Sequence, residues 1–274
     1  MKKLLVPTDF SPQAENALKV AAQIAKTQKC DIHLLHILEL PLQKVDALSS
    51  YNDLPEAVYF MKLARKHFEE LLKKDYLKGI NIQDHVEFHE IFKGIYHICE
   101  KQQIDLVIMG SHGASGFKEL LIGSNTEKVV RTSAVPVLVI KKDHAHFKVD
   151  NFVFASDFND ESKPPYAKAV DFAKLLQAKI HLLMVNTPNR FMTTLEAEKR
   201  MTAFIKSVDF KNYTINLYND ETIESGIMNF AQSIDADLIG MSTHGRQGLS
   251  HFFNGSISED LVNHAKRPVI TFKI

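Results

Sequence analysis

Short apolar runs alternate with longer amphipathic segments along the first half of the chain. The runs predict buried β-strands, since strands covered on both faces are nearly continuous apolar stretches, and they cover residues 3–7, 32–38, 86–92, 104–109 and 136–140. Apolar residues recur at helical spacing between them, and the predicted helices cover residues 12–28, 54–78, 94–102 and 124–133. This alternation predicts a mostly parallel, doubly wound α/β sheet, because parallel strands need crossover connections that cover both faces.

The second half of the chain repeats the order of the first. The run at 180–184 repeats the run at 32–36, and Ser-Asp-Phe at 156–158 repeats Thr-Asp-Phe at 8–10. The chain is therefore predicted to hold two copies of one unit. The predicted domains are residues 1–142 and 149–274, and the charged segment 141–149 is the predicted linker.

The second copy is shorter than the first. Asp9 and His112 lie 103 residues apart, whereas the matching Asp157 and His244 lie 87 residues apart. A shorter second helix, predicted at 194–208, accounts for most of this difference.

Composition limits the compartment and the classes of partner. The 274 residues, 45% of them hydrophobic, suffice for two domains of about 135 residues. Thirty-three basic residues balance 33 acidic ones, so no long-range field favours nucleic acid or an anionic membrane, and neither is expected. The apolar start ends at Pro7, and no later segment reaches the roughly 18 apolar residues of a membrane span. Cys30 and Cys99 are isolated, as is typical of a reducing compartment, so we expect a cytoplasmic protein.

One segment interrupts the apolar pattern with glycines. The strand at 104–109 ends in a turn at Gly110 and Gly113, and nine residues later Gly123-Ser124 opens a helix. Glycine lets the backbone pass close to a ligand, and the free amides of a helix N-terminus suit an anion such as phosphate. The same frame recurs in the second copy at Ser242, Gly245, Gly255 and Ser256. Both copies are therefore predicted to hold an anion-binding loop.

These segments together resemble the universal stress protein family. The resemblance rests on the Pro-Thr-Asp-Phe-Ser start at 7–11, the Gly-x2-Gly-x9-Gly-Ser spacing and the Pro-Val-Leu-Val-Ile ending at 136–140, and it covers nearly the whole chain. It implies two doubly wound five-stranded parallel sheets of strand order 3-2-1-4-5, the adenine-nucleotide alpha-hydrolase-like fold. In the family's ATP-binding branch the three glycines hold the ribose and phosphates. The resemblance therefore implies an ATP-binding regulatory protein of the stress response, with magnesium accompanying the phosphates.

Carried over residue by residue, the family's site falls on separate segments that the fold should unite. The adenosine is expected against Pro7, Thr8, Asp9 and Ile37. The ribose and phosphates are expected against Met109, Gly110, Gly113, Gly123, Ser124, Asn125 and Thr126. The second copy keeps the frame at Asp157, Val185, Gly245, Gly255, Ser256 and Ser258. Because the strand order reverses between the strands ending at Pro7 and Met109, Asp9 and Gly110 should face each other across a crevice.

The second copy departs from the pattern at one glycine. Ser242 stands where the first copy has Gly110. A side chain there is expected either to crowd the nucleotide or to require a backbone conformation that serine disfavours. Arg246, which follows Gly245 where the first copy has Ala114, could pair with a phosphate.

Other interpretations of the same residues stay open. Asp9 and Ser124 could simply cap helices without any ligand. His112 and His244 recur in the loops but lack a recognisable nucleophile or orienting carboxylate, and the chain has no Walker Gly-Lys-Ser/Thr motif. A slow ATPase or phosphate-transferring enzyme using the same pocket is one alternative function. A scaffold with vestigial pockets is the other, favoured in the second copy by Ser242.

The final strand of each half suggests how the copies assemble. The runs at 137–140 and 269–274 should be apolar edge strands, which pair readily. The resemblance implies that the copies form an internal pseudo-dimer through them, and the sequence leaves open whether two chains pair again as a homodimer. Two polar clusters remain. His144-x-His146 lacks neighbouring metal ligands, and Arg65-Lys66-His67 is more simply interpreted as a solvated helix face than as a phosphate contact.

Overall fold

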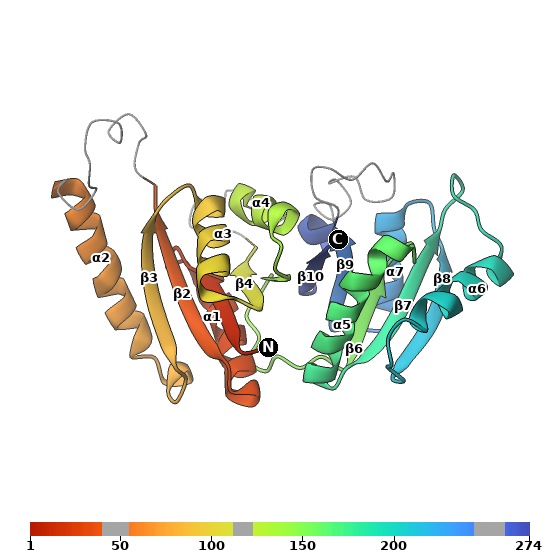
Figure 1. Cartoon of the computed structure of the whole chain (residues 1–274), viewed down its shortest axis with the longest axis horizontal. Coiled ribbons are helices and arrows are strands. Elements are labelled where there is room, and N and C mark those ends of the chain that lie inside the picture. Colours follow the sequence, from red (N-terminus) through yellow and green to blue (C-terminus); the bar gives the residue numbers. More distant parts are fainter. Residues whose placement is uncertain (40–54, 112–122, 244–260) are drawn as a thin grey trace.

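The computed structural model describes residues 1–39, 55–111, 123–243 and 261–274. Figure 1 shows the two halves of the chain side by side along the long axis, with both chain ends near the middle. The strands of the first half are β1 (Lys3–Pro7), β2 (Asp31–Leu38), β3 (Ile82–Phe88), β4 (Leu106–Gly110) and β5 (Val137–Ile140). Those of the second half are β6 (Asn151–Ala155), β7 (Lys179–Asn186), β8 (Tyr213–Asn219), β9 (Leu238–Thr243) and β10 (Val269–Lys273).

Helices connect the strands within each half. They are α1 (Pro12–Gln28), α2 (Pro55–Leu72), α3 (Ile91–Gln102), α4 (Ser124–Thr132), α5 (Lys163–Leu176), α6 (Thr194–Ile205) and α7 (Ile223–Ser233), with 3-10 turns η3 (Asp75–Leu77) and η4 (Asp160–Ser162). One apolar cluster lies between the sheet and α1, α2, α5 and α6, and the other lies under α3, α4 and α7. The sheet is therefore covered on both faces, as the apolar strands require.

Each half has the predicted strand order 3-2-1-4-5, and within each half all pairings are parallel. The two sheets are joined, because β5 pairs antiparallel with β10, with Leu138 opposite Ile270. The result is one sheet of ten strands in the order β3-β2-β1-β4-β5-β10-β9-β6-β7-β8. The apolar strands that each half leaves at its edge thus cover one another.

The predicted boundaries are wrong at one strand. The strand predicted at 86–92 lies at 82–88, and α3 begins at Ile91 rather than at Gly94. The reason is that β3 is an edge strand whose Gln83 and Asp84 are exposed, so its first half does not form an apolar run. Smaller errors affect helices, since α2 ends at Leu72 before the separate turn η3, and α6 ends three residues before the predicted 208.

Local capping explains where α1 begins. Ser11 is the N-cap, its Oγ accepts a hydrogen bond of 3.2 Å from the Ala14 amide, and Pro12 occupies the first helical position, where proline is favoured. The preceding turn is repeated in both copies. Phe10 and Phe158 both have positive φ, 62° and 55°, and their amides donate to Thr8 and Ser156 hydroxyls at 3.0 Å.

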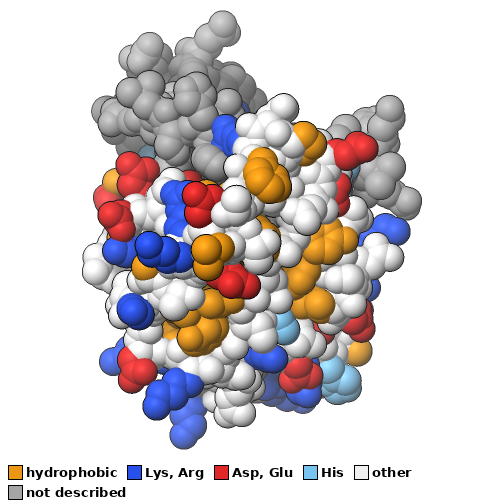
Figure 2. Space-filling model, turned by 90° about the vertical axis from the view of Figure 1, so that its right-hand side faces the viewer, with side chains coloured by type: hydrophobic (Ala, Val, Ile, Leu, Met, Phe, Trp, Pro, Cys, Tyr) orange, Lys and Arg blue, Asp and Glu red, His pale blue; other side chains and the backbone are white. Residues whose placement is uncertain are grey.

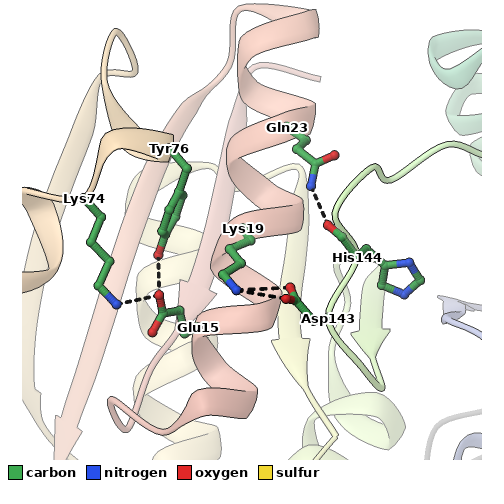
Figure 3. A network of polar contacts seen from close by, with 7 residues as sticks. All are labelled: Glu15, Lys19, Gln23, Lys74, Tyr76, Asp143 and His144. Carbon is green, nitrogen blue, oxygen red and sulfur yellow. Dashed lines mark hydrogen bonds and ion pairs between the residues drawn. The ribbon is translucent and has the colours of Figure 1, made fainter.

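The linker lies along α1 (Figure 3). Lys19 forms an ion pair of 3.1 Å with Asp143, the Gln23 amide nitrogen donates to the His144 carbonyl at 2.9 Å, and the Gln23 oxygen accepts from the Phe147 amide at 2.6 Å. The segment between the halves is therefore fixed to the first unit rather than spanning open solvent. A separate contact on α1 joins Glu15, one turn before Lys19, to the Lys74 ammonium group, which donates to it at 2.5 Å.

Two equivalent lysines cross the interface between the halves. Lys141 follows β5 and donates to the Asn263 carbonyl at 3.2 Å, and Lys273 ends β10 and donates to the Thr132 carbonyl at 3.2 Å. Thr132 is the last residue of α4, and residues 261–264 are helical. Each lysine therefore satisfies a carbonyl at the C-terminal end of a helix of the other half, where the helix dipole favours a cation.

Charged and apolar side chains are mixed on the face of the molecule at the α6 end (Figure 2). Figure 2 shows acidic and basic side chains interspersed over the face at the α6 end, with apolar side chains between them. No helix in the described part of the chain has both the length and the apolar content needed to cross a bilayer.

The lysine contacts yield a stability prediction. Lys273→Met should lower the free energy of unfolding by about 0.5–2 kcal/mol, because it removes a cation from a partly buried helix C-terminus. Lys141→Met should lower it less, because burial lowers the pKa of Lys141 to about 8 and offsets the attraction of its charge to the helix end. Lys142→Met, which removes a neighbouring exposed charge, is the matched control and should change little. Urea unfolding followed by circular dichroism measures all three, and equal midpoints for Lys273→Met and Lys142→Met would contradict the proposed contribution.

Candidate functional site

The carboxyl ends of β1, β2 and β4 meet where the strand order reverses. β1 pairs with β2 on one side and with β4 on the other, and such a reversal opens a crevice beyond the strand ends. Six of the residues predicted to contact ligand lie on these strands or directly after them: Pro7, Thr8, Asp9, Ile37, Met109 and Gly110. The fold thus brings together residues that are about 100 positions apart in the sequence.

Three of these side chains share one face of the sheet. Met109 belongs to the apolar cluster under α3 and α4, and Ile37 packs against that cluster. Pro7 lies on the same face, because it is two residues after Leu5 of that cluster and side chains alternate along a strand. This face offers an apolar wall at the strand ends.

Asp9 lies just beyond the carboxyl end of β1. Its side chain is exposed, and its Oδ1 accepts a hydrogen bond of 3.0 Å from the Ser11 amide. The interpretation of Asp9 as a local cap is therefore realised at that oxygen, while the N-cap of α1 is Ser11 itself. A carboxylate at the surface remains able to accept further hydrogen bonds, because it has two oxygens with about four lone-pair sites.

The N-terminus of α4 is held against the end of β4. The Gly123 amide donates to the Ser111 carbonyl at 2.8 Å, and the buried Thr126 hydroxyl donates to the Gly110 carbonyl at 3.0 Å. Gly123 is the N-cap, so the interpretation of Ser124 as the cap of its own helix is wrong. Ser124 and Asn125 are exposed in the first turn, where backbone amides have no intrahelical partner. Gly113 and His112 lie outside the described residues.

Gly110 is required by the close approach of α1. A Cβ at this position would lie 2.7 Å from the Gln13 carbonyl oxygen, closer than real side chains pack. Glycine here therefore serves the packing of α1 on β4, on the face of the sheet opposite to Met109.

The second copy accommodates Ser242 by changing the helix start. Ser242 is fully buried and has no positive φ, so the expectation of a disfavoured backbone conformation is wrong. Instead α5 begins six residues after Asp157, behind the 3-10 turn η4, whereas α1 begins three residues after Asp9. By strand alternation the Ser242 side chain lies on the α5 face, and Met241 lies under α7. The added side chain is therefore accommodated at the start of α5, on the face of the sheet opposite to Val185.

The carboxylate of Asp157 is used internally. Asp157 is buried, and its Oδ1 accepts from the Asn159 amide at 3.2 Å and from the Ser162 hydroxyl at 3.1 Å. Its Oδ2 accepts from the Asn159 side-chain amide at 2.5 Å, and Arg200 in turn donates to Asn159. These bonds within the unit hold the carboxylate that was predicted to contact a nucleotide.

The crevice beside Asp157 is small. It encloses about 40 Å³ between Asp157, Val185, Asn186, Arg190, Met192 and neighbouring residues, whereas pockets for small molecules span roughly 300–1,000 Å³. The loop after β7 closes it, because the Asn186 side chain bonds both the Met192 amide at 2.7 Å and the Met192 carbonyl at 3.1 Å. The other predicted residues of this copy, with the neighbouring His244 and Arg246, lie outside the described residues: Gly245, Gly255, Ser256 and Ser258.

Sequence reasoning missed one glycine in each unit. A Cβ at Gly94 of α3 would lie 2.8 Å from Ile37 Cδ1, and one at Gly226 of α7 would collide with Val185. Both glycines let a helix lie directly on the side chain predicted to contact the adenosine. The signal was present in the sequence, because each glycine is followed by isoleucine at the equivalent position of its copy, Ile95 and Ile227.

Two further polar clusters lie on the linker and on α2. Among the described residues, no three His, Cys, Asp or Glu side chains come close enough to hold a metal ion, and His144-x-His146 is no exception. Arg65 and Lys66 lie exposed on α2, and the His67 ring packs 4.8 Å from the Phe10 ring. Cys30 and Cys99 are both buried free thiols.

Comparison with known proteins places this geometry in a family. The model of the universal stress protein family matches residues 1–141 and 219–273. The universal stress protein MJ0577 of Methanocaldococcus jannaschii is 32% identical over 159 residues, covering 53% of this chain and 97% of that protein. The universal stress protein Slr1230 of Synechocystis is 21% identical over 293 residues, with 100% of both chains covered.

A solved structure shares the whole architecture. The crystal structure of a universal stress protein from Archaeoglobus fulgidus matches with a TM-score of 0.74 and 22% identity, covering 99% of this chain and 96% of that one. The likeness in fold thus extends over both halves, and the segments that match the family model make up more than half of the 274 residues. The chain therefore belongs to the universal stress protein family.

Proposed function

We propose that the chain is a regulatory protein that binds ATP in the crevice of its first unit, residues 1–142. The observation that carries the proposal is the position of the α4 N-terminus. Thr126 and Gly123 tie it to the end of β4 at Gly110 and Ser111, beyond the strand end where the order reverses. Free amides at a helix start bind phosphate through hydrogen bonds and the helix dipole. This anion site lies next to the apolar wall and to Asp9.

Each part of the nucleotide has a matching group in this crevice. Pro7, Ile37 and Met109 offer apolar surface to the base, and the Asp9 carboxylate accepts hydrogen bonds from ribose hydroxyls. The amides of Ser124, Asn125 and Thr126 receive the phosphates without a lysine, and magnesium accompanies them as the counter-ion of the triphosphate. The glycine spacing of the family's ATP-binding branch, complete in the first unit, supports the same assignment.

We propose further that one chain binds one nucleotide. The internal bonding of Asp157 and the small crevice beside it support a second unit that stays empty. The second unit then serves as a scaffold that covers the edge of the first through the β5 and β10 pairing. Two buried thiols without a disulfide support a reducing, cytoplasmic location.

Binding of ATP to matched variants tests this assignment. The wild-type chain should bind about one ATP per chain in isothermal titration calorimetry. Asp9→Ala should weaken binding tenfold or more, because a hydrogen bond to a charged group contributes about 1.5–3 kcal/mol. Gly123→Val should also weaken it, because a branched side chain would stand beside the amides that receive the phosphates. Asp157→Asn, the matched change in the second unit, should leave the affinity unchanged. Two ATP per chain, or an effect of Asp157→Asn equal to that of Asp9→Ala, would contradict it.

The missed glycines provide a second test. Gly94→Ala should displace the Ile37 side chain, since the added Cβ would lie 2.8 Å from Ile37 Cδ1, and should weaken ATP binding about threefold to tenfold (about 0.7–1.4 kcal/mol). Gly226→Ala collides with Val185 in the second unit and should lower stability without changing affinity. Fluorescence competition with a labelled nucleotide gives the affinities and thermal unfolding gives the stabilities. Equal affinities for the two variants would remove Ile37 from the site.

A further inference from the structure

A pair of histidines joins β2 to the edge strand β3 in the first unit. His33 Nδ1 lies 3.0 Å from His85 Nε2, and the two rings are stacked, with centroids 5.2 Å apart and planes inclined by 12°. His33 is 1% exposed, so the pair lies in the interior at the side of the sheet. Since β3 is the last strand on its side of the sheet among the described residues, this contact is part of what holds the edge strand.

The second unit shows a different solution at the equivalent position. His181 occupies the place of His33, and both of its ring nitrogens have neutral partners, Asn151 Oδ1 at 3.1 Å and Thr214 Oγ1 at 2.9 Å. In the first unit Lys3 stands where Asn151 stands in the second, and its ammonium group instead donates to the Gln102 carbonyl. No described group bonds His33 Nε2.

The carboxylates near the two rings are too weak to favour protonation against burial and the nearby cations. Burial is the main cause that lowers the pKa of His33, followed by the neighbouring His85 and by Lys3, while Asp31 opposes them. Burial also lowers the pKa of His85, against Asp84 and Glu87 of β3, with Lys101 of α3 adding to the lowering. The closed strand therefore keeps both rings neutral under conditions in which free histidine is charged.

We propose that the His33–His85 pair is an acid-sensitive contact that releases the edge strand β3 from β2 when the pH falls. Two neutral imidazoles share one hydrogen between the facing nitrogens, whereas two imidazolium rings present hydrogens to each other and repel. Opening β3 exposes both rings to water, where they take up protons. Since α3 follows β3 directly and Gly94 of α3 lies on Ile37, the opening also loosens one wall of the crevice.

The direction of the pH effect on the β3 contact follows from proton linkage. A histidine whose pKa is lowered in the closed state adds stability above its ordinary pKa of about 6.5, and this stability is lost as the pH falls below that value, because only the open state takes up protons there. Two such rings at pH 5.5 raise the opening equilibrium of β3 by about tenfold to hundredfold over pH 7.5. One such ring, His181, also has a lowered pKa, so β8 should respond less.

Hydrogen exchange of the full chain without nucleotide tests the contact, so the result does not depend on ATP binding. Exchange of the amides of β3 and β8 is measured by mass spectrometry at pH 7.5 and 5.5, after correction for the intrinsic effect of pH. Protection of β3 should fall about tenfold more than that of β8. His85→Asn, which installs the residue found at the equivalent Asn216 of the second unit, should abolish the excess.

A second variant covers the case in which His85→Asn disrupts the strand. Lys3→Asn gives His33 Nε2 the partner that Asn151 gives His181, and it should reduce the excess acid response of β3 while leaving β8 unchanged. An equal response of β3 and β8 in the wild-type chain, or an unchanged response of β3 in both variants, would overturn the proposal.

Discussion

The antiparallel pairing of β5 with β10 is the contact on which the arrangement of this molecule depends. Each half ends in an apolar strand that leaves one row of backbone groups unpaired, and an exposed edge of this kind attracts other chains. The pairing of Leu138 with Ile270 covers both edges at once. Lys141 and Lys273 then cross the same boundary to helix ends of the opposite half. The remaining edges, β3 and β8, contain exposed polar residues such as Gln83 and Asn219, as edge strands in monomeric proteins commonly do.

The two units have diverged at the places where a ligand would bind, while their cores have kept the same plan. Gly110 lets α1 approach β4. In the second unit the Ser242 side chain fills the equivalent space, and a 3-10 turn, η4, precedes α5. Asp9 lies exposed, whereas Asp157 is buried under bonds from Asn159 and Ser162. Each unit therefore serves as a control for the other, because the same fold presents the same position with different chemistry.

Much of this fold could be predicted from the sequence, because buried parallel strands form apolar runs and the duplication repeats them. The strand order itself came from the family resemblance. The start of β3 was missed because Gln83 and Asp84 face solvent, so apolar periodicity carries little signal there. The ligand contacts proposed for the first unit rest on its motif, whereas the packing roles of Gly94 and Thr126 could not be predicted, since each depends on a helix meeting a distant strand. The closure of the second crevice depends on Asn186 and its bonds to Met192, which no short-range pattern encodes.

The docking of the linker on α1 has a consequence for how the molecule behaves on dilution. Subunits that associate from separate chains come apart when the protein becomes scarce, because their pairing is bimolecular. Here Gln23 and Lys19 hold the connecting segment, so the second unit is always presented to the first at a high effective concentration. The ten-stranded sheet should therefore persist at the low copy numbers at which a two-chain assembly would dissociate.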